Sequence, residues 1–279
     1  MISLTPRYTD LPVVGSVMPL LELPTNCPGC GVGITAEVLS RQAYACDCGH
    51  HFRIGAEAWI ALLADEGSFA ERWSDIRPHD LLQWRLPKPY QLVIDEARAD
   101  GRNEAVRTGT ARIGGRPVWL GVFDFEFVGG TLSIVAGERL ARGLEAAAAD
   151  RLPYVLVAAS GGARMQEGVL ALMQMAKTNG AAGRLHAAGV PYITVLTDPT
   201  YGGTAASLAL LGDVVIAEPG ARIGFTGPRV IKQATYADLP DDFQTAEFQL
   251  EHGQVDIVVP RTEIRACVAH VIDLLGPVL

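Results

Sequence analysis

A glycine pair between an apolar run and a helical segment is the stretch of this sequence with the clearest chemical potential. Gly161-Gly162 follow the apolar run from Tyr154 to Ala159, and the residues from Met165 to Ala176 have helical spacing. A strand that turns into a helix in this way leaves N–H groups unpaired at the start of the helix, where they favour negative charge. No Ser/His/Asp set or carboxylate pair accompanies the turn. The predicted chemistry is stabilisation of an oxyanion by backbone N–H groups, with any base supplied from elsewhere.

The same pattern occurs a second time, about forty residues later. A predicted buried strand from Val190 to Thr197 leads into Gly202-Gly203 and a small-residue helix from Thr204 to Leu211. One glycine pair alone would be an ordinary strand-to-helix turn. Two such units place two N–H-rich turns beyond the carboxyl ends of parallel strands, which is where open α/β folds bind ligands.

Four of the five cysteines lie close together in the sequence and suggest a metal site. Cys27 and Cys30 have the spacing of a zinc knuckle, whereas Cys46 and Cys48 form a pair that is one residue shorter than usual. His50 or His51 could replace one of these thiolates. The grouping favours structural zinc in a reducing compartment over a disulfide framework, and it predicts a zinc ribbon with a structural or lid role.

Composition limits the function classes further. The chain has 279 residues, 49% of them hydrophobic, and a formal net charge of −8. The charge argues against broad binding to nucleic acids or anionic membranes. No apolar run reaches the roughly 18 residues of a membrane helix, and residues 1–24 do not have the pattern of a secretory signal. We therefore expect a cytoplasmic location.

Periodicity and proline placement suggest four segments. These are an N-terminal arm (1–26), the zinc ribbon (27–53), a mostly helical connecting region (54–105) that includes a helix from Ala56 to Leu63, and a main α/β domain (106–279). In the main domain Gly114-Gly115 predict the turn of a hairpin. Further elements are predicted there as a long helix from Ile134 to Ala149, strands at 214–217, 222–225 and 255–259, and helices from 227, at 245–253 and at 262–275.

Motifs along nearly the whole chain after the arm support a family resemblance. They are CPGCG at 27–31, CGHHFRI at 48–54, DEGSF at 65–69, FDFEFVGG at 123–130, ASGGARMQEG at 159–168, LMQMAKT at 172–178, PYITVLTDP at 191–199, LGD at 211–213, IGFTGPRVI at 223–231 and EHG at 251–253. In this order and spacing the chain resembles the carboxyltransferase beta subunits of bacterial acetyl-CoA carboxylase, members of the crotonase-like superfamily. The implied fold is a ClpP/crotonase spiral ββα core preceded by a zinc ribbon.

The resemblance implies transfer of a carboxyl group from carboxybiotin, held on a separate carrier protein, to acetyl-CoA or a related acyl-CoA. Biotin itself would act as the base, and backbone N–H groups would hold both oxyanions. It also implies a partner, because the beta subunit contributes mainly the CoA-binding half of the site. An alpha-type subunit would supply the biotin-binding half within an α₂β₂ heterotetramer.

The resemblance also assigns roles to particular residues. The implied oxyanion donors are Gly161, Gly162, Ala163, Gly202 and Gly203, and which turn faces the thioester and which faces biotin stays open. The implied substrate contacts are Gly129, Gly130, Arg164, Lys177, Tyr201 and Arg229. For Arg164 a structural salt bridge is an equal alternative, and for Lys177 a structural role is favoured.

Several positions depart from the usual family sequence. Ser133 and Ile134 stand where the family usually has Gly-Ser, and Thr204, Ala205 and Leu208 replace Val, Ser and Phe after the second glycine pair. Thr226 and Lys232 replace Ala and Glu. Added side chains near a pocket that needs close backbone approach are expected to alter substrate choice. Together with the shortened knuckle, they point towards a specialised paralogue.

Two other functions compete with carboxyl transfer. The first is biotin-independent decarboxylation of a malonyl thioester on CoA or an acyl carrier protein, which would use the same oxyanion hole. The second is a zinc-ribbon protein that binds nucleic acid and has lost catalysis, which the acidic charge and the intact glycine pairs argue against.

Overall fold

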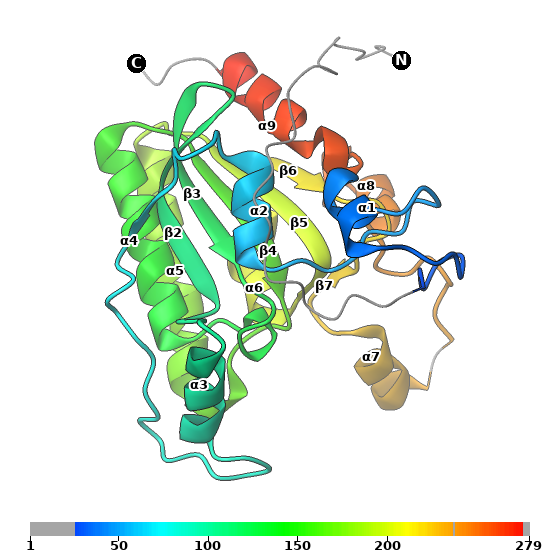
Figure 1. Cartoon of the computed structure of the whole chain (residues 1–279). Coiled ribbons are helices and arrows are strands. Elements are labelled where there is room, and N and C mark those ends of the chain that lie inside the picture. Colours follow the sequence, from blue (N-terminus) through cyan, green and yellow to red (C-terminus); the bar gives the residue numbers. More distant parts are fainter. Residues whose placement is uncertain (1–25, 237, 276–279) are drawn as a thin grey trace.

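A mixed β-sheet covered by helices on both faces forms the centre of the computed structural model, which describes residues 26–236 and 238–275 (Figure 1). The sheet order is β1-β2-β3-β4-β5-β6-β8, with β7 paired to β5. Pairing is antiparallel among β1, β2 and β3 and parallel from β3 onwards. The strands are β1 (Ala70–Arg72), β2 (Val106–Ile113), β3 (Arg116–Phe123), β4 (Tyr154–Ser160), β5 (Tyr192–Tyr201), β6 (Val214–Ala217), β7 (Ile223–Gly224) and β8 (Ile257–Val258).

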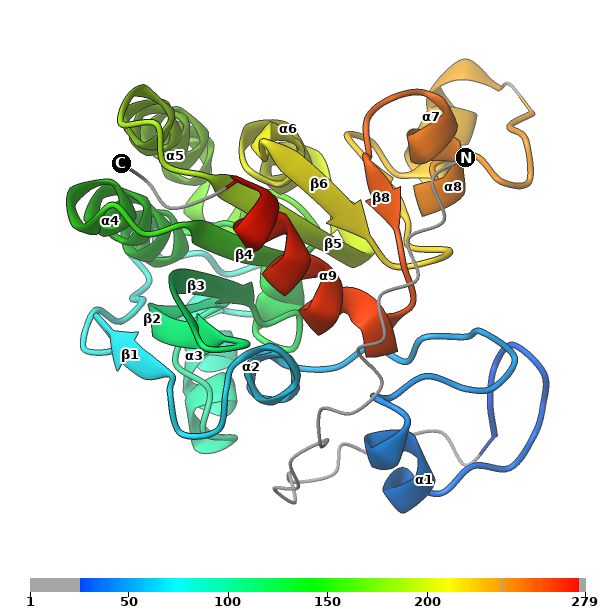
Figure 2. The same cartoon turned by 90° about the horizontal axis from the view of Figure 1, so that it is seen from above.

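The helices form two layers, with α4 and α5 on one face of the sheet and α2 and α9 on the other (Figure 2). Among the described residues the α-helices are α1 (Ala36–Arg41), α2 (Ala56–Leu63), α3 (Tyr90–Ala99), α4 (Ile134–Asp150), α5 (Val169–Ala187), α6 (Gly202–Ser207), α7 (Pro228–Thr235), α8 (Ala246–Glu251) and α9 (Arg261–Leu275). Short 3₁₀ turns η1 (Val128–Gly130), η2 (Met165–Glu167) and η3 (Ala209–Leu211) lie between them. None of the helices described is long and apolar enough to cross a membrane.

The unbroken apolar sequence of β4 follows from burial on both faces of the sheet. Val155 and Val157 belong to the core cluster that includes residues of α2 and α9, whereas Tyr154 and Leu156 belong to the cluster that includes residues of α4 and α5. All seven residues of β4 are buried. Side chains alternate across a strand, so each face must be apolar when both faces are covered.

Most sequence predictions of elements are confirmed. The predicted helix at Ala56–Leu63, the hairpin turn at Gly114-Gly115 and the long helix from Ile134 all occur, as do the strands that precede both glycine pairs. The short segments at the end of the chain also occur, as β6, β7, α7, α8, β8 and α9.

Three predictions need correction. The region 54–105 is not mostly helical, because only α2 and α3 are helices there and β1 joins the sheet. The helix predicted from Met165 is interrupted, since Gly168 (φ 53°, ψ −135°) separates η2 from α5. The helix predicted from Thr204 to Leu211 begins two residues earlier at Gly202 and ends at Ser207, with η3 following.

The four-segment division stays a prediction, although α2 shares a core cluster with β3 and β4. Residues 1–25 of the predicted N-terminal arm lie outside the described residues. Only Asn26 of that arm is described, and it forms an isolated β-bridge with Gly33.

Candidate active site

The two glycine turns meet at the carboxyl ends of β4 and β5, as the sequence predicts. A Cβ placed on Gly202 would lie only 3.0 Å from Cα of Gly162, and one placed on Gly162 would lie 3.4 Å from Cα of Gly202. Both glycines also have positive φ angles, +117° for Gly162 and +62° for Gly202. Glycine at these two positions therefore permits both the backbone conformation and the close approach of the turns.

Hydrogen bonds within the protein already occupy three of the five predicted N–H donors. Gly161 N–H donates to Gly129 O at 2.9 Å, and Gly202 N–H donates to Phe225 O at 3.0 Å. Gly162 N–H donates to the hydroxyl of Ser160 at 3.0 Å. Within the described part of the chain, Ala163 and Gly203 are the two predicted donors whose N–H groups have no such acceptor.

The direction of the Ala163 N–H group follows from its peptide plane. Gly162 O accepts a hydrogen bond from Leu132 N–H at 2.8 Å, and the peptide that it shares with Ala163 is trans. Carbonyl and N–H groups point in opposite directions across a trans peptide, so the Ala163 N–H points away from Leu132. A Cβ on Gly162 would be 3.7 Å from Gly203 N, which places the second donor beside the first turn.

Arg164, the residue after Ala163, has a buried side chain that forms a salt bridge. Its side chain has 0% exposure and pairs with Glu104 at 2.7 Å. It also donates to the hydroxyl of Tyr90 at 2.9 Å and to both Oγ1 and the carbonyl oxygen of Thr131, at 2.9 and 2.8 Å. Burial lowers the pKa of Arg164, but the charge of the Glu104 carboxylate raises it by more. The pKa of Arg164 is therefore above its usual value, and the guanidinium stays charged. The structure contains the salt bridge, and substrate binding by Arg164 stays a prediction.

Glu167 extends this buried cluster to the start of α4. Its carboxylate accepts from the Tyr90 hydroxyl at 2.8 Å and from Ile134 N–H at 2.6 Å. Burial raises the pKa of Glu167. The cluster thus joins α3, the loop before α4 and the turn that carries Ala163. Sequence reasoning missed Tyr90, Glu104 and Glu167, because residues this far apart in the chain give no local signal.

Gly129 and Gly130, the predicted glycines before α4, pack against the first glycine turn and the end of β4. Gly129 accepts the Gly161 N–H, as described above. Gly130 is buried, and a Cβ there would lie 2.1 Å from Ala159 O of β4. Their contacts in the structure are with the protein backbone, so substrate binding by these two residues stays a prediction.

Substrate binding by the remaining predicted residues stays a prediction. Lys177 forms an ion pair with Glu138 on α4. Tyr201 lies directly before the second turn and is partly buried, which raises its pKa. The side chain of Arg229 lies outside the described residues, so its predicted contact remains untested.

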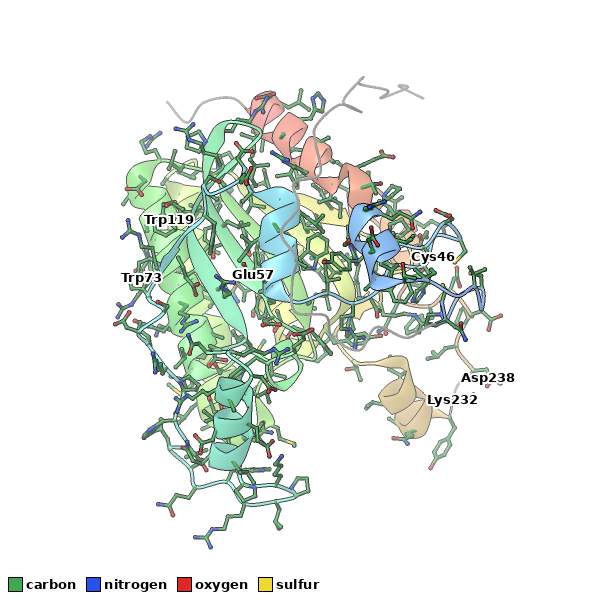
Figure 3. All side chains as sticks on the ribbon, viewed as in Figure 1. Cys46, Glu57, Trp73, Trp119, Lys232 and Asp238 are labelled. Carbon is green, nitrogen blue, oxygen red and sulfur yellow. The ribbon has the colours of Figure 1, made fainter. Side chains whose placement is uncertain are left out.

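Two of the sequence departures have structural explanations. Ser133 is the N-cap of α4, and its buried hydroxyl accepts from Ala136 N–H at 2.9 Å. Lys232 pairs with Asp238 at 3.4 Å on α7, the helix that stands out from the body of the molecule (Figure 3).

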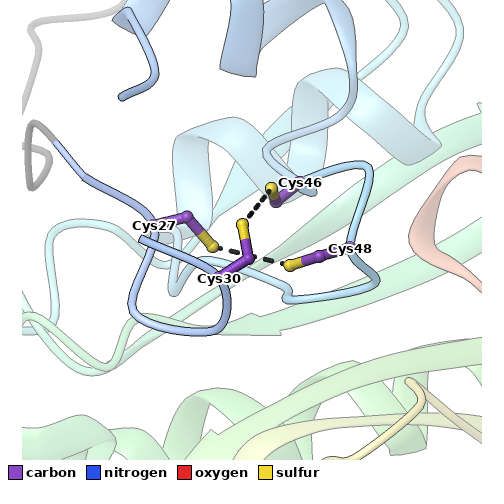
Figure 4. A group of neighbouring side chains, drawn as sticks. All are labelled: Cys27, Cys30, Cys46 and Cys48. Atoms are coloured by element: carbon purple, nitrogen blue, oxygen red, sulfur yellow. Dashed lines mark hydrogen bonds between the residues drawn. The ribbon is translucent and has the colours of Figure 1, made fainter. Parts of the chain in front are cut away.

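The four clustered cysteines have the geometry of a tetrahedral metal site. Their sulfur atoms all lie within 4.8 Å of one another, with 3.6 Å between Cys27 and Cys48 and 3.7 Å between Cys30 and Cys46 (Figure 4). Four sulfurs at about 2.3 Å from one zinc ion would be about 3.8 Å apart. Gly29 N–H points at the Cys27 sulfur from 3.3 Å, as expected for a knuckle. The shortened Cys46–Cys48 pair therefore does not prevent a four-sulfur site.

The two neighbouring histidines are engaged elsewhere. His51 accepts a hydrogen bond at Nε2 from Arg261 N–H at 3.4 Å, and His50 packs edge-on against Phe52. Neither belongs to the group of side chains that could share a metal ion. The residues fit zinc held by the cysteines alone.

Comparison with known proteins identifies the family of the chain. A family model described as the carboxyl transferase domain matches residues 90–250. The acetyl-coenzyme A carboxylase carboxyl transferase subunit beta of Opitutus terrae is 52% identical over 232 residues, 83% of this chain and 80% of that protein. The protein of the same name from Citrifermentans bemidjiense is 45% identical over 253 residues, 90% of each chain.

The chain belongs to the family of acetyl-CoA carboxylase carboxyl transferase beta subunits. In one member, the subunits beta/alpha protein of Salinispora tropica, the similar region is part of a longer chain. That protein is 50% identical over 252 residues, which cover 89% of this chain and 44% of the longer one.

Solved structures place the family fold in a wider group. A transcarboxylase 12S structure has a TM-score of 0.66 and 27% identity, covering 78% of this chain and 41% of that one. A Pseudomonas malonate decarboxylase hetero-tetramer in complex with malonate also has a TM-score of 0.66, with 25% identity over 79% of this chain and 82% of that one. The α/β fold predicted from the sequence is therefore confirmed as the fold of these carboxylating and decarboxylating enzymes.

Proposed function

We propose that this chain is the beta subunit of an acetyl-CoA carboxylase and catalyses carboxyl transfer to acetyl-CoA to give malonyl-CoA. The observation that carries the proposal is the meeting of two glycine turns with N–H groups free at Ala163 and Gly203. It stands in a chain that is 45% to 52% identical to beta subunits over most of its length. A related acyl-CoA is the alternative substrate of the same site.

The free N–H groups suit the charge that develops in this reaction. Removing a proton from the acetyl methyl group moves the C–H electron pair towards the thioester, whose oxygen becomes an oxyanion. The enolate carbon then forms the new C–C bond to CO₂. N–H donors fixed in advance stabilise such an oxygen, and loss of one donor typically costs a factor of about 10² to 10³ in kcat. Carboxybiotin on a carrier protein would supply the CO₂, and the biotin left after its release would accept the methyl proton.

The residues around the turns hold these donors in place. Gly129 fixes one side of the first turn and the Arg164 cluster fixes the other. Neither turn carries a side chain that could act as a base, which agrees with a base on the cofactor. We leave open which donor faces the thioester and which faces the biotin oxygen.

We further propose that the chain acts together with an alpha-type subunit and a biotin carrier protein in the cytoplasm. The fused beta/alpha relative and the hetero-tetrameric malonate decarboxylase support a partner of this kind. The family assembly implied by the sequence is an α₂β₂ heterotetramer. Zinc in the four-cysteine site would be structural, because the site's sulfur ligands leave no open position for substrate.

The test is malonyl-CoA decarboxylation by the purified chain, alone and with an alpha-type subunit, in the presence and absence of free biotin. If the chain is a carboxylase subunit, we expect turnover only when the partner and biotin are both present, since biotin must accept the carboxyl group. Turnover that does not need biotin would instead identify a malonyl-thioester decarboxylase. Binding of DNA or RNA in a salt-dependent gel shift, without turnover, would favour the nucleic-acid-binding alternative.

A further inference from the structure

Two hydroxyl groups lie between the glycine turns and connect them. Thr204 Oγ1 and Ser160 Oγ are 2.8 Å apart, and both side chains have 0% exposure. Ser160 Oγ also accepts the Gly162 N–H at 3.0 Å. A continuous path of hydrogen bonds therefore runs from the second turn, through two hydroxyls, to the backbone of the first.

Each end of this path adjoins one of the free donors. Thr204 directly follows Gly203, and Gly162 directly precedes Ala163. The bond from Gly162 N–H to Ser160 and the bond from Leu132 N–H to Gly162 O hold the peptide groups on both sides of Gly162. The orientation of the Ala163 N–H depends on the second of these groups.

Valine has nearly the same shape as threonine but no hydroxyl, so Thr204→Val removes the hydroxyl with little change in volume. In a valine variant, Ser160 would lose its hydrogen-bond partner on the second turn while keeping the one on the first. Hydrogen bonds in a buried hydroxyl network are stronger than isolated hydrogen bonds in water. Loss of the Ser160–Thr204 bond should therefore loosen the contact between the two turns.

We propose that Thr204 and Ser160 are positioning residues that fix the separation of the two donor turns in this chain. This inference rests on the proposed function, because the separation matters when both turns act on one reacting system. Misplacement of a reacting group by about 1 Å can cost a factor of about 10² in rate. A hydroxyl pair that restrains the turns therefore acts on kcat through Ala163 and Gly203, without touching the substrate itself.

The experiment compares Thr204→Val, Thr204→Ser and Ser160→Ala with Thr178→Val as the matched control. Thr178 is also fully buried, and its hydroxyl donates to Gln174 O at 2.9 Å within α5. Each variant is assayed with the alpha-type subunit for biotin-dependent malonyl-CoA decarboxylation, giving kcat and KM separately. Hydrogen exchange of peptides covering 160–165 and 202–206, and the melting temperature, are measured on the same proteins.

The expected result is a fall in kcat of about 5- to 20-fold for Thr204→Val with KM within about 2-fold, and recovery in Thr204→Ser. Ser160→Ala should also lower kcat, and adding Thr204→Val to it should cause little further loss because the two residues share one bond. Hydrogen exchange should rise in both turns of Thr204→Val and of Ser160→Ala, and should stay at the wild-type level in Thr204→Ser and in the control. The control should keep the wild-type kcat.

Equal kcat values and equal exchange in Thr204→Val and the control would overturn the inference, as would a change confined to KM. Failure of the proposed function looks different. In that case the wild-type protein shows no biotin-dependent turnover, and the exchange measurement still decides whether the hydroxyl bridge restrains the turns.

Discussion

At the scale of single residues, the site depends on which backbone N–H groups the protein leaves unbonded. Five candidates come from the sequence, and internal acceptors remove Gly161, Gly162 and Gly202 from that set. These three still matter, because their hydrogen bonds and small size determine where Ala163 and Gly203 lie. A glycine in such a turn therefore contributes to function by shaping the backbone, even where its own N–H is hydrogen-bonded within the protein.

The substitution Gly202→Ala tests this point. Alanine at position 202 would have to adopt the positive φ angle of Gly202. Its Cβ would lie 3.0 Å from Gly162 Cα, so the turns must move apart. We expect kcat for biotin-dependent malonyl-CoA decarboxylation to fall at least about 100-fold, with a loss of about 1–3 kcal/mol in the free energy of unfolding. Enzyme kinetics and denaturant unfolding measure the two effects.

Gly189→Ala is the matched control for Gly202→Ala. Gly189 has a φ of +67°, close to that of Gly202, but no atom lies within 4 Å of the added Cβ. It should show the backbone cost without the loss of activity. Comparable kcat values for the two variants would mean that the approach of the turns does not matter for catalysis.

At the scale of elements, a buried arginine joins the predicted zinc ribbon to the body of the protein. Arg261, at the start of α9, pairs with Glu218 and donates to Phe52 O at 2.8 Å and, more weakly, to the carbonyl oxygens of Ala43 and Tyr44. Its guanidinium also lies 5.0 Å from the ring centre of Trp59 on α2. The ribbon backbone, α9 and α2 thus share one charged centre, which fits a structural role for the ribbon.

Metal analysis of Cys46→Ser tests the shortened cysteine pair. We expect about one zinc per chain in the wild-type protein and a clear loss in the variant, because zinc needs all four sulfur ligands. Cys267→Ser is the control, since Cys267 lies on α9 against the main core cluster and outside the four-cysteine group. Retention of full zinc by Cys46→Ser would show that another residue, such as His50, completes the site.

At the scale of the whole molecule, the two helix layers bury polar groups whose ionisation affects stability. Asp124, just after β3, is almost fully buried and accepts Glu126 N–H at 3.1 Å. Burial, with a smaller contribution from the Glu126 charge, raises the pKa of Asp124 to about 6. The folded protein therefore favours the neutral carboxyl more than the unfolded chain does. The stability that this contributes is fully present below the unfolded pKa and is lost as the pH rises through about 6.

The variant Asp124→Asn keeps an acceptor oxygen and removes the charge, so its effect should depend on pH. Between the unfolded pKa near 3.9 and pH 7.5, ionisation of Asp124 costs the wild-type protein about 3 kcal/mol of stability. We expect the variant to be more stable than wild type at pH 7.5 and nearly equal at pH 4. Denaturant unfolding at both pH values gives the comparison.

Asp65→Asn provides a control of opposite sign. Although burial raises the pKa of Asp65, N–H groups of Gly114 and Gly115 and the Arg265 side chain lower it more. This variant should lose stability relative to wild type at neutral pH, and the loss should shrink in acid. A stability difference for Asp124→Asn that is the same at pH 4 and 7.5 would contradict the assignment of its pKa.

The sequence by itself determined the features that depend on local order. Apolar runs, glycine pairs and cysteine spacing predict β4 and β5, the donor turns and the metal cluster, and the motifs predict the family. These signals are readable because each is contained in one short stretch whose pattern follows from backbone geometry and burial.

Only the tertiary structure decided how these parts act on one another. It showed that Arg164 is buried against Glu104, that the N–H groups of Ala163 and Gly203 have no acceptor among the described residues, and that Thr204 reaches Ser160. Each of these facts joins residues from different stretches of the chain. Hydrogen-bond satisfaction in a buried site is a property of the packed arrangement, since a donor counts as free only when every acceptor around it is known.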